Sequence, residues 1–306
     1  MKLPTHSTTE QNNNTLEALK NPGLFQKKYS LRYYLATRLL PKRVRGSVEL
    51  LYAFVRIPDE IIDTEYKDDL ARGLFALSEF ETEWEQVWAG TPTNNEFLSR
   101  CHTLFKKHAI PFEYSLDFLK AMKQDATVSR YDTYKELEMY MYGSAGVVGY
   151  MLSNIFGYKD GALPHAKSLA YAMQMTNFLR DIDEDYVKRN RIYLPQEDMH
   201  QFNITDAEIR ARNFSPAFKE LMKYKVTKTQ KLYTHGYEGI HLLSIDTRLA
   251  VFVSGKMYER VLERIVRNDY NPFVWKSDTG AHKVYYLISA IIEYQFRYIK
   301  KYTHAK

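Results

Sequence analysis

The sequence contains very little of several residue types and patterns that mark whole classes of protein. Cys101 is the only cysteine among 306 residues, which excludes an intramolecular disulfide and a thiolate metal cluster. We therefore expect a reducing, cytoplasmic location. No apolar run approaches the roughly 20 residues that a membrane-spanning helix needs. The best candidate, "VYYLISAII" at 284–292, ends at Glu293.

The beginning of the chain also lacks a recognisable targeting signal. The first 20 residues, with "THSTTEQNNNT", are polar and contain no apolar core of a secretory signal. No later stretch is a linker rich in Pro, Gly or Ser. We therefore predict a flexible polar leader over residues 1–22 and one domain over residues 23–306.

The formal charge of +6 favours partners such as nucleic acid, an anionic membrane surface or phosphorylated small molecules. Zinc-finger spacing, RNP-like aromatic patterns and compact basic blocks are all missing, so we expect no nucleic-acid partner. The end of the chain, "EYQFRYIKKYTHAK", mixes aromatic and basic side chains. This composition fits a peripheral contact with an anionic membrane, and it fits a final packing helix with a solvated basic tail equally well.

Almost every long segment repeats its apolar residues with helical spacing, and no convincing hairpin signal occurs. The segments expected to be helical are 44–64, 68–88, 96–108, 113–124, 133–155, 164–187, 205–212, 215–242, 246–267 and 281–301. Breakers such as "GTPTNN" at 90–95 separate them. The pattern predicts one all-α domain of about ten helices.

The stretch "LLYAFVRIPDEIID" at 50–63 sets two carboxylates into an apolar helix. At about 100° per residue, Tyr52, Arg56, Asp59 and Asp63 share an arc of roughly 60°. The remaining surface is apolar, so this helix is predicted to be buried on most sides with a narrow polar strip. Pro58 predicts a kink just before Asp59.

A second strip occurs in "QMTNFLRDIDEDYVKRNRIYLP" at 174–195. Gln174, Asn177, Asp181 and Asp185 span roughly 80° of the helical wheel. A single pair of carboxylates four residues apart usually lies on an exposed face. Two such pairs on apolar helices, each with arginine nearby, indicate a shared site.

Carboxylate and amide oxygens are ligands for hard cations, and Mg²⁺ is typically bound by carboxylates together with substrate phosphates. Two facing strips could bind Mg²⁺, with Mn²⁺ as a substitute, around a diphosphate whose other oxygens contact arginine. An apolar cavity beyond the metal would enclose a hydrocarbon and exclude water. The strips therefore predict a substrate with a polyanionic head and an apolar tail.

The chain resembles the squalene and phytoene synthases over roughly residues 25–270. The resemblance rests on both carboxylate stretches and on "YMYGSAGVVGYML" at 140–152, which is similar to a Tyr-x-x-x-x-Ala-Gly-x-x-Gly segment of that family. It implies an all-α isoprenoid synthase fold with a central cavity. It also implies a head-to-head condensation of two prenyl diphosphates through a cyclopropylcarbinyl diphosphate, ending by proton loss or by hydride transfer from NADPH.

The resemblance assigns roles to individual residues. The implied metal ligands are Asp59, Asp63, Asn177, Asp181 and Asp185, with Glu60 nearby. The implied diphosphate-binding residues are Arg56, Gln174, Arg180, Arg191, Tyr193 and Arg32. The implied catalytic residues are Tyr140, Arg56, Arg180 and Tyr52. Gly146 and Gly149 would permit close helix approach, and Asp125 and Tyr258 match further site-lining positions. Tyr52 and Tyr140 could instead only pack, Gln174 could be a core amide, and Arg180 could pair with Glu184.

The sequence departs from the family pattern at three places. Pro58 precedes Asp59, where another residue is more usual. Arg32 stands where Ser or Thr is usual, and Lys276 stands near a position that is often arginine. We expect a phytoene-type product from geranylgeranyl diphosphate, with NADPH needed only for a squalene-type reaction. Synthesis of squalene, presqualene diphosphate or diapophytoene from farnesyl diphosphate is the alternative. A non-catalytic assembly factor of the same family is a third possibility, and the stretch "DIDED" argues against a terpene cyclase.

Overall fold

The structure, a computed structural model, describes residues 9–66, 69–274 and 279–299. Every regular element in these residues is a helix, and an isolated bridge between Tyr158 and Leu243 is their one β-type pairing. The prediction of an all-α fold is therefore confirmed. None of the described helices is long and apolar enough to cross a membrane.

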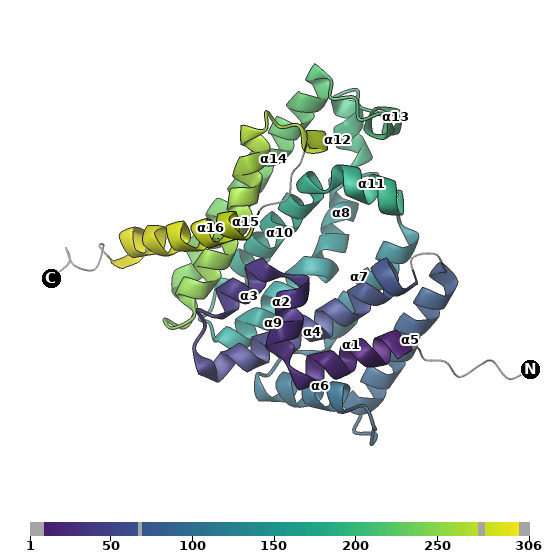
Figure 1. Ribbon diagram of the computed structural model, residues 1–306, viewed down its shortest axis with the longest axis vertical. Helices are drawn as coiled ribbons and strands as arrows, with labels where there is room; N and C mark the ends of the chain where they lie inside the picture. The colour runs from purple at the N-terminus through teal and green to yellow at the C-terminus, as the bar shows by residue number, and fades with distance from the viewer. Residues whose placement is uncertain (1–8, 67–68, 275–278, 300–306) are drawn as a thin grey trace, which may run out of the picture.

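The helices follow one another with short connections (Figure 1). The first half of the chain forms α1 (Thr9–Lys20), α2 (Pro22–Tyr29), α3 (Leu31–Thr37), α4 (Lys42–Glu60), α5 (Leu70–Trp88), α6 (Glu96–Lys107), α7 (Phe112–Thr127), α8 (Tyr134–Met141) and α9 (Val147–Phe156). The second half forms α10 (Ala162–Arg180), α11 (Ile182–Arg189), α12 (Gln196–Gln201), α13 (Asp206–Arg210), α14 (Pro216–Glu238), α15 (Arg248–Arg267) and α16 (Gly280–Tyr294).

Short stretches of other helical geometry adjoin several of these helices. The π-helical turns are η1 (Ile61–Glu65), η2 (Tyr142–Gly146) and η5 (Gln295–Ile299), and the 3₁₀ turns are η3 (Gly239–Leu242) and η4 (Pro272–Val274). α4 continues through Pro58 and leaves α-helical geometry only after Glu60. Asp63 therefore lies in a wider π turn, a geometry that often accompanies functional sites.

The predicted flexible leader is wrong for the part of it that the structure describes. α1 covers most of this part and packs against α2, α4 and α6, with Ala18 fully buried. Nη1 of Arg100 donates to the carbonyl of Leu19 at 3.1 Å. These tertiary contacts stabilise a helix whose own sequence is too polar to predict it. Residues 1–8 lie outside the described residues.

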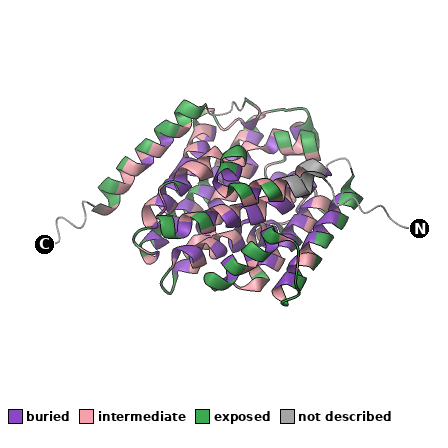
Figure 2. Ribbon diagram, turned by 60° about the horizontal axis from the view of Figure 1, so that its bottom comes forward, coloured by how far each residue is buried: buried purple, intermediate pink, exposed green. Residues whose placement is uncertain are grey.

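Two large groups of buried side chains hold most of the helices together, and a third, small group joins α15 to α16. One centres on Phe54, Trp84 and Phe105, whose ring centroids lie 5.0–5.3 Å apart. The other joins α10, α14 and α15 around residues such as Phe218 and Tyr233. Figure 2 shows the buried side of most helices turned inward, whereas α16 stands at the edge with much of its surface exposed.

Candidate active site

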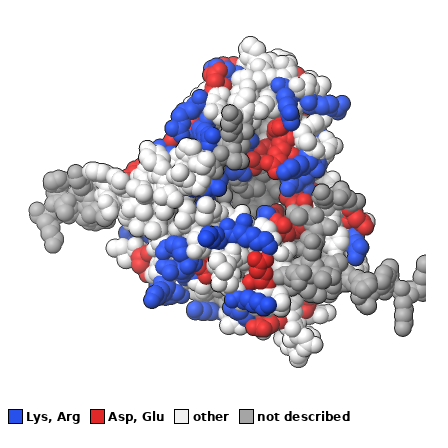
Figure 3. Space-filling view, in the orientation of Figure 1, with Lys and Arg blue, Asp and Glu red and all other residues white. Residues whose placement is uncertain are grey.

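A cavity of about 850 Å³ lies among the helices, within the range of known ligand pockets. Its wall follows α4 and the adjoining η1 from Val48 to Asp63, a length of about 22 Å at 1.5 Å per residue. It also follows α10 from Ala162 to Asp181. On both helices the lining is apolar near the amino end and acidic at the carboxyl end. The cavity therefore has one apolar end and one charged end, and Figure 3 shows side chains of both signs around a hollow on this face.

Carboxylates of α4 form ion pairs with an arginine of the same helix. Arg56 forms ion pairs with Asp59 and Glu60, and its guanidinium carbon lies 4.9 Å from the ring centroid of Tyr29. Asp59 is 29% exposed and lines the cavity, whereas Glu60 is buried and absent from the lining. The predicted strip therefore faces the cavity, and Glu60 contributes through Arg56.

The second strip is divided by a break that the sequence did not indicate. α10 ends at Arg180, and Asp181 stands between α10 and α11 with φ −100° and ψ 13°. Nε of Arg180 donates to Oδ1 of Asp181 at 2.6 Å, and Nη2 bonds to Oδ2 of the same carboxylate. Arg180 thus makes a two-pronged pair with Asp181 rather than pairing with Glu184.

Arg189 connects the two acidic strips. Its Nη2 lies 3.0 Å from Oδ2 of Asp63, and its Nη1 lies 3.3 Å from Oδ1 of Asp185. Arg191 adds a contact of 3.1 Å from Nη1 to Oδ1 of Asp63. Residues far apart in the sequence thus form one cluster, and the two strips face each other across the charged end of the cavity.

Burial and the neighbouring carboxylates at this end raise the pKa of two aspartates. Burial raises the pKa of Asp59 to about 7, with Arg56 opposing the shift and Asp63 adding to it. Burial and the neighbouring Asp181 raise the pKa of Asp185 to about 7. A cluster of acids with raised pKa values in a cavity is a common sign of a functional site, and a bound cation would relieve their repulsion.

Aromatic rings form a stack beside the acids. Tyr193 lies against Phe178 with centroids 4.1 Å apart and planes 9° apart, and against Tyr140 with centroids 5.7 Å apart. The hydroxyl of Tyr193 donates to Oδ1 of Asp125 at 2.6 Å, and Nη1 of Arg191 lies 3.2 Å from Oδ2. Ring faces attract positive charge, so this wall could stabilise a cation that forms in the cavity.

A second aromatic group borders the cavity on α3, α4 and α15. Tyr33 lies between Tyr52 and Tyr258, with centroid distances of 6.0 Å and 5.3 Å. The guanidinium carbon of Arg32 lies 6.0 Å from the centroid of Tyr258. Burial raises the pKa of Tyr52 and that of Tyr33, so both hydroxyls stay protonated and can donate hydrogen bonds.

The structure brings all of the sequence-predicted site residues to this cavity. Its lining includes Arg32, Tyr52, Arg56, Asp59, Asp63, Tyr140, Gln174, Asn177, Arg180, Asp181, Asp185, Arg191 and Tyr193. Asp125 and Tyr258, the less specific matches, line it as well. Lys276 lies outside the described residues.

Sequence reasoning missed two residues at the centre of the site. Arg189 belongs to a run of charges that reads as solvated, and its position four residues after Asp185 was the available signal. Phe178 reads as ordinary core, although it follows Asn177 directly and lines the cavity.

Glycine lets the wall helices approach closely. A Cβ at Gly149 would lie 3.1 Å from the carbonyl oxygen of Ala166, and one at Gly146 would lie 3.2 Å from the ring of Tyr171. A larger residue would force these neighbours to move. The close helix approach predicted at both positions is therefore present between α10 and the η2–α9 segment.

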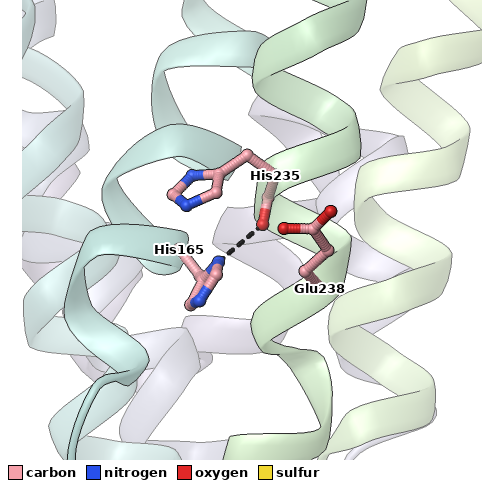
Figure 4. A group of neighbouring side chains, drawn as sticks. All are labelled: His165, His235 and Glu238. Carbon is pink, nitrogen blue, oxygen red and sulfur yellow. Dashed lines mark hydrogen bonds between the residues drawn. The ribbon is translucent and has the colours of Figure 1, made fainter.

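A separate group of potential metal ligands lies where α10 crosses α14 (Figure 4). Ligand atoms of His165, His235 and Glu238 are within 4.8 Å of one another. Nδ1 of His165 is 2.7 Å from the carbonyl oxygen of His235, and Nδ1 of His235 is 2.7 Å from Oγ of Ser168. Hydrogen bonds thus occupy Nδ1 of each ring, and imidazole is a poor ligand for Mg²⁺. We assign no metal to this group.

The donor set at the acidic end fits a hard cation better. It consists of carboxylates and an amide, and Oδ1 of Asn177 is buried with no hydrogen-bond partner among the described residues. Nε of Arg56 and Nε of Arg189 are also buried without an acceptor in the described structure. An unused acceptor and unused donors in the lining of one cavity suit the joint binding of a cation and a polyanion.

Comparison with known proteins agrees with this geometry. The profile of the family described as squalene/phytoene synthase matches residues 26–284. The chain belongs to the squalene/phytoene synthase family. The resemblance predicted from the three motifs is thereby confirmed, and the chain is a prenyltransferase of this type.

Individual relatives of this family member cover most of its length. A phytoene synthase of Arthrospira platensis is 31% identical over 261 residues, which are 80% of this chain and 82% of that protein. A 15-cis-phytoene synthase of Synechocystis sp. is 30% identical over 260 residues, which are 80% and 75% of the two chains.

Solved structures of the family share the fold. A dehydrosqualene synthase in complex with a ligand has a TM-score of 0.82 and 28% identity, covering 94% of this chain and 99% of that one. Squalene synthase HpnC from Alicyclobacillus acidocaldarius has a TM-score of 0.75 and 25% identity, covering 87% and 98%. Both the relatives and the fold support head-to-head condensation of prenyl diphosphates.

Proposed function

We propose that this enzyme joins two molecules of geranylgeranyl diphosphate head to head, through a cyclopropylcarbinyl diphosphate, and releases phytoene. One observation carries the proposal: Arg189 contacts Asp63 and Asp185, so both acidic strips meet at the charged end of an otherwise apolar cavity. The relatives named phytoene synthases support the choice of substrate.

Mg²⁺ fits the acidic end, where Asp59, Asp63, Asn177, Asp181 and Asp185 would hold it. When bound, the cation would neutralise charge on the diphosphate and make it a better leaving group. Neutral amide and ionised carboxylate oxygens are the donors that Mg²⁺ prefers.

The protein's own side chains would act around that group. Arg56, Arg180, Arg189 and Arg191 carry the fixed positive charges that would bind diphosphate oxygens. These arginines pair with carboxylates of the acidic end. When the carboxylates bind a cation, the guanidinium groups would lose these partners and could donate hydrogen bonds to the diphosphate.

The aromatic stack beside the acids and the apolar end of the cavity would bind the hydrocarbon. The faces of Tyr140, Phe178 and Tyr193 would stabilise allylic and cyclopropylcarbinyl cations. The apolar side chains of α4 and α10 would exclude water, which would otherwise trap each cation as an alcohol. Loss of a proton from the final cation gives the triene and needs no reductant.

The alternative is a squalene, presqualene diphosphate or diapophytoene synthase that uses farnesyl diphosphate. The similarity to a dehydrosqualene synthase structure supports this alternative. A non-catalytic assembly role is the remaining candidate of another class, and the complete set of acids and arginines in the cavity speaks against it.

The test is to incubate purified protein with either geranylgeranyl or farnesyl diphosphate, with Mg²⁺, and with or without NADPH. Phytoene from the longer substrate without NADPH is the expected product. A thirty-carbon hydrocarbon from farnesyl diphosphate would support the alternative, and its dependence on NADPH would identify the squalene type. Absence of diphosphate release from both substrates would support the non-catalytic role.

A further inference from the structure

A buried ion pair joins α12 to α14 outside the cavity. Nζ of Lys225 lies 2.7 Å from Oδ2 of Asp198, and the exposed fractions of the two side chains are 0% and 5%. The ammonium group also lies 5.4 Å from the ring centroid of Tyr134. Neither Lys225 nor Asp198 belongs to the cavity lining, so the proposed reaction gives this pair no direct role.

A buried ion pair is a costly way to join two helices. Burial lowers the pKa of Lys225, and the attraction of Asp198 opposes this shift. Both charges lose hydration when they are buried, and apolar side chains of similar volume often stabilise a fold equally well or better. The pair does fix a geometry, because either charge without its partner would be buried and uncompensated. We therefore expect Lys225 and Asp198 to serve position more than stability.

The position of Asp198 matters because a part of the cavity wall comes directly before it in the chain. Arg191 and Tyr193 line the cavity, and the side chains of both contact Asp125. They belong to residues 190–198, which we call the α11–α12 segment, and its first six residues lie outside any helix. Since helical hydrogen bonds do not fix these residues, the placement of Arg191 and Tyr193 depends on how the segment is attached to the rest of the fold.

Backbone hydrogen bonds attach the α11–α12 segment to residues 129–132, which precede α8. Three amides of the segment donate to carbonyl oxygens there: Ile192 to Ser129 at 3.0 Å, Gln196 to Tyr131 at 2.8 Å and Glu197 to Asp132 at 3.0 Å. The ring of Tyr131 also lies near that of Tyr193, with centroids 6.1 Å apart and planes 22° apart. The Lys225–Asp198 pair comes directly after the last of these bonds and attaches the end of the segment to α14.

The attachment to α14 relates the segment to the second acidic wall of the cavity, because α14 packs along α10, which carries Asn177. We propose that Lys225 is a positioning residue: by binding Asp198, it holds the α11–α12 segment and its cavity-lining side chains in place for the reaction. The proposal rests on the proposed function for the roles of Arg191 and Tyr193. A displacement of about 1 Å can cost about 100-fold in rate, so a small shift of the segment would be enough to slow turnover.

The test replaces the ion pair by apolar side chains in Lys225→Met/Asp198→Leu. The midpoint of denaturant unfolding should stay at or above that of the parent, since an apolar pair avoids the loss of hydration. Turnover, measured as diphosphate release, should nevertheless fall by about tenfold or more, with a lower kcat and a higher KM, because Arg191 and Tyr193 lose their fixed positions.

Hydrogen exchange gives a readout that does not depend on turnover. The amides of Ile192, Gln196 and Glu197 should exchange faster in the apolar variant, because local opening of the α11–α12 segment becomes easier. Exchange in α10 should not change. The matched control is Lys223→Gln/Glu220→Gln, which removes an exposed ion pair of the same 2.7 Å length from α14 and should match the parent in stability, turnover and exchange.

Asp198→Asn takes the place of the apolar variant if that variant does not fold. It keeps the size of the side chain and an oxygen that can accept from Nζ of Lys225, and it should show the same changes to a smaller degree. Parent-like turnover, unchanged exchange at the three amides, or a loss of turnover that only follows the unfolded fraction would each overturn the proposal. A parent that releases no diphosphate would contradict the proposed function instead, and exchange at the three amides would then decide whether Lys225 positions the segment.

Discussion

Nη2 of Arg189 lies 3.0 Å from Oδ2 of Asp63, although the two residues come from opposite walls of the cavity. Without a metal, this guanidinium neutralises carboxylates that would otherwise repel one another. Arg189→Gln should therefore lower the free energy of unfolding of the metal-free protein by about 1–3 kcal/mol, and Mg²⁺ should restore more stability to the variant than to the parent.

Thermal melts with and without Mg²⁺ check this expectation. Arg212→Gln is the matched control. Nε of Arg212 lies 2.6 Å from Oδ1 of Asp183, which is on α11 like Arg189, but this pair is outside the cavity lining. An equal response of both variants to Mg²⁺ would contradict a cation site at Asp63.

Asp181 and Asp183 allow a comparison between a carboxylate inside the cavity and a neighbouring one outside it. Asp181 lines the cavity, whereas Asp183 pairs with Arg212 and does not. Asp181→Asn and Asp59→Asn should leave the protein folded and reduce turnover by at least about 100-fold, because each removes charge from a proposed metal ligand. Asp183→Asn should stay within about twofold of the parent, since Asp183 is outside the cavity lining. Steady-state diphosphate release measures all three, and near-normal rates for Asp181→Asn would refute the ligand assignment.

The stability of the metal-free protein should depend on pH between about 4 and 7. The pKa of Asp59 and that of Asp185 are raised to about 7 in the folded state, against 3.8 for an ordinary Asp. In this range the folded protein binds more protons than the unfolded chain, so the free energy of unfolding falls as pH rises and levels off above 7. Denaturant titrations at several pH values measure the slope. The Asp59→Asn/Asp185→Asn variant should flatten it, and an unchanged slope would show that these acids titrate normally.

The role of the aromatic wall can be separated from that of its hydroxyls. Tyr140→Phe retains the ring that faces Tyr193 at 5.7 Å, and should keep turnover within about tenfold of the parent. Tyr140→Leu removes the ring face and should cost about tenfold more than the Phe variant if that face stabilises the cation. Product analysis should then find more alcohols from water capture. Equal turnover rates for the two variants would show that Tyr140 only packs against its neighbours.

The sequence allowed prediction of the site more completely than of the fold around it. The strips on α4 and α10 were predictable because a narrow polar face on an apolar helix has few explanations other than a cavity. The helices α1, α2, α3 and α12 escaped prediction because they are short or polar and depend on packing. The break at Asp181 was missed because helical periodicity continues across it, and the ion pair of Asp181 with its neighbour Arg180 leaves no mark on the spacing of apolar residues.

The shared direction of α4 and α10 has an electrostatic consequence. Both helices run toward the acidic end, so the negative ends of their dipoles point there. This contribution belongs to the backbone and survives any side-chain substitution. Replacing a single aspartate should therefore weaken cation binding in degree, and the preference of this end for positive charge should persist.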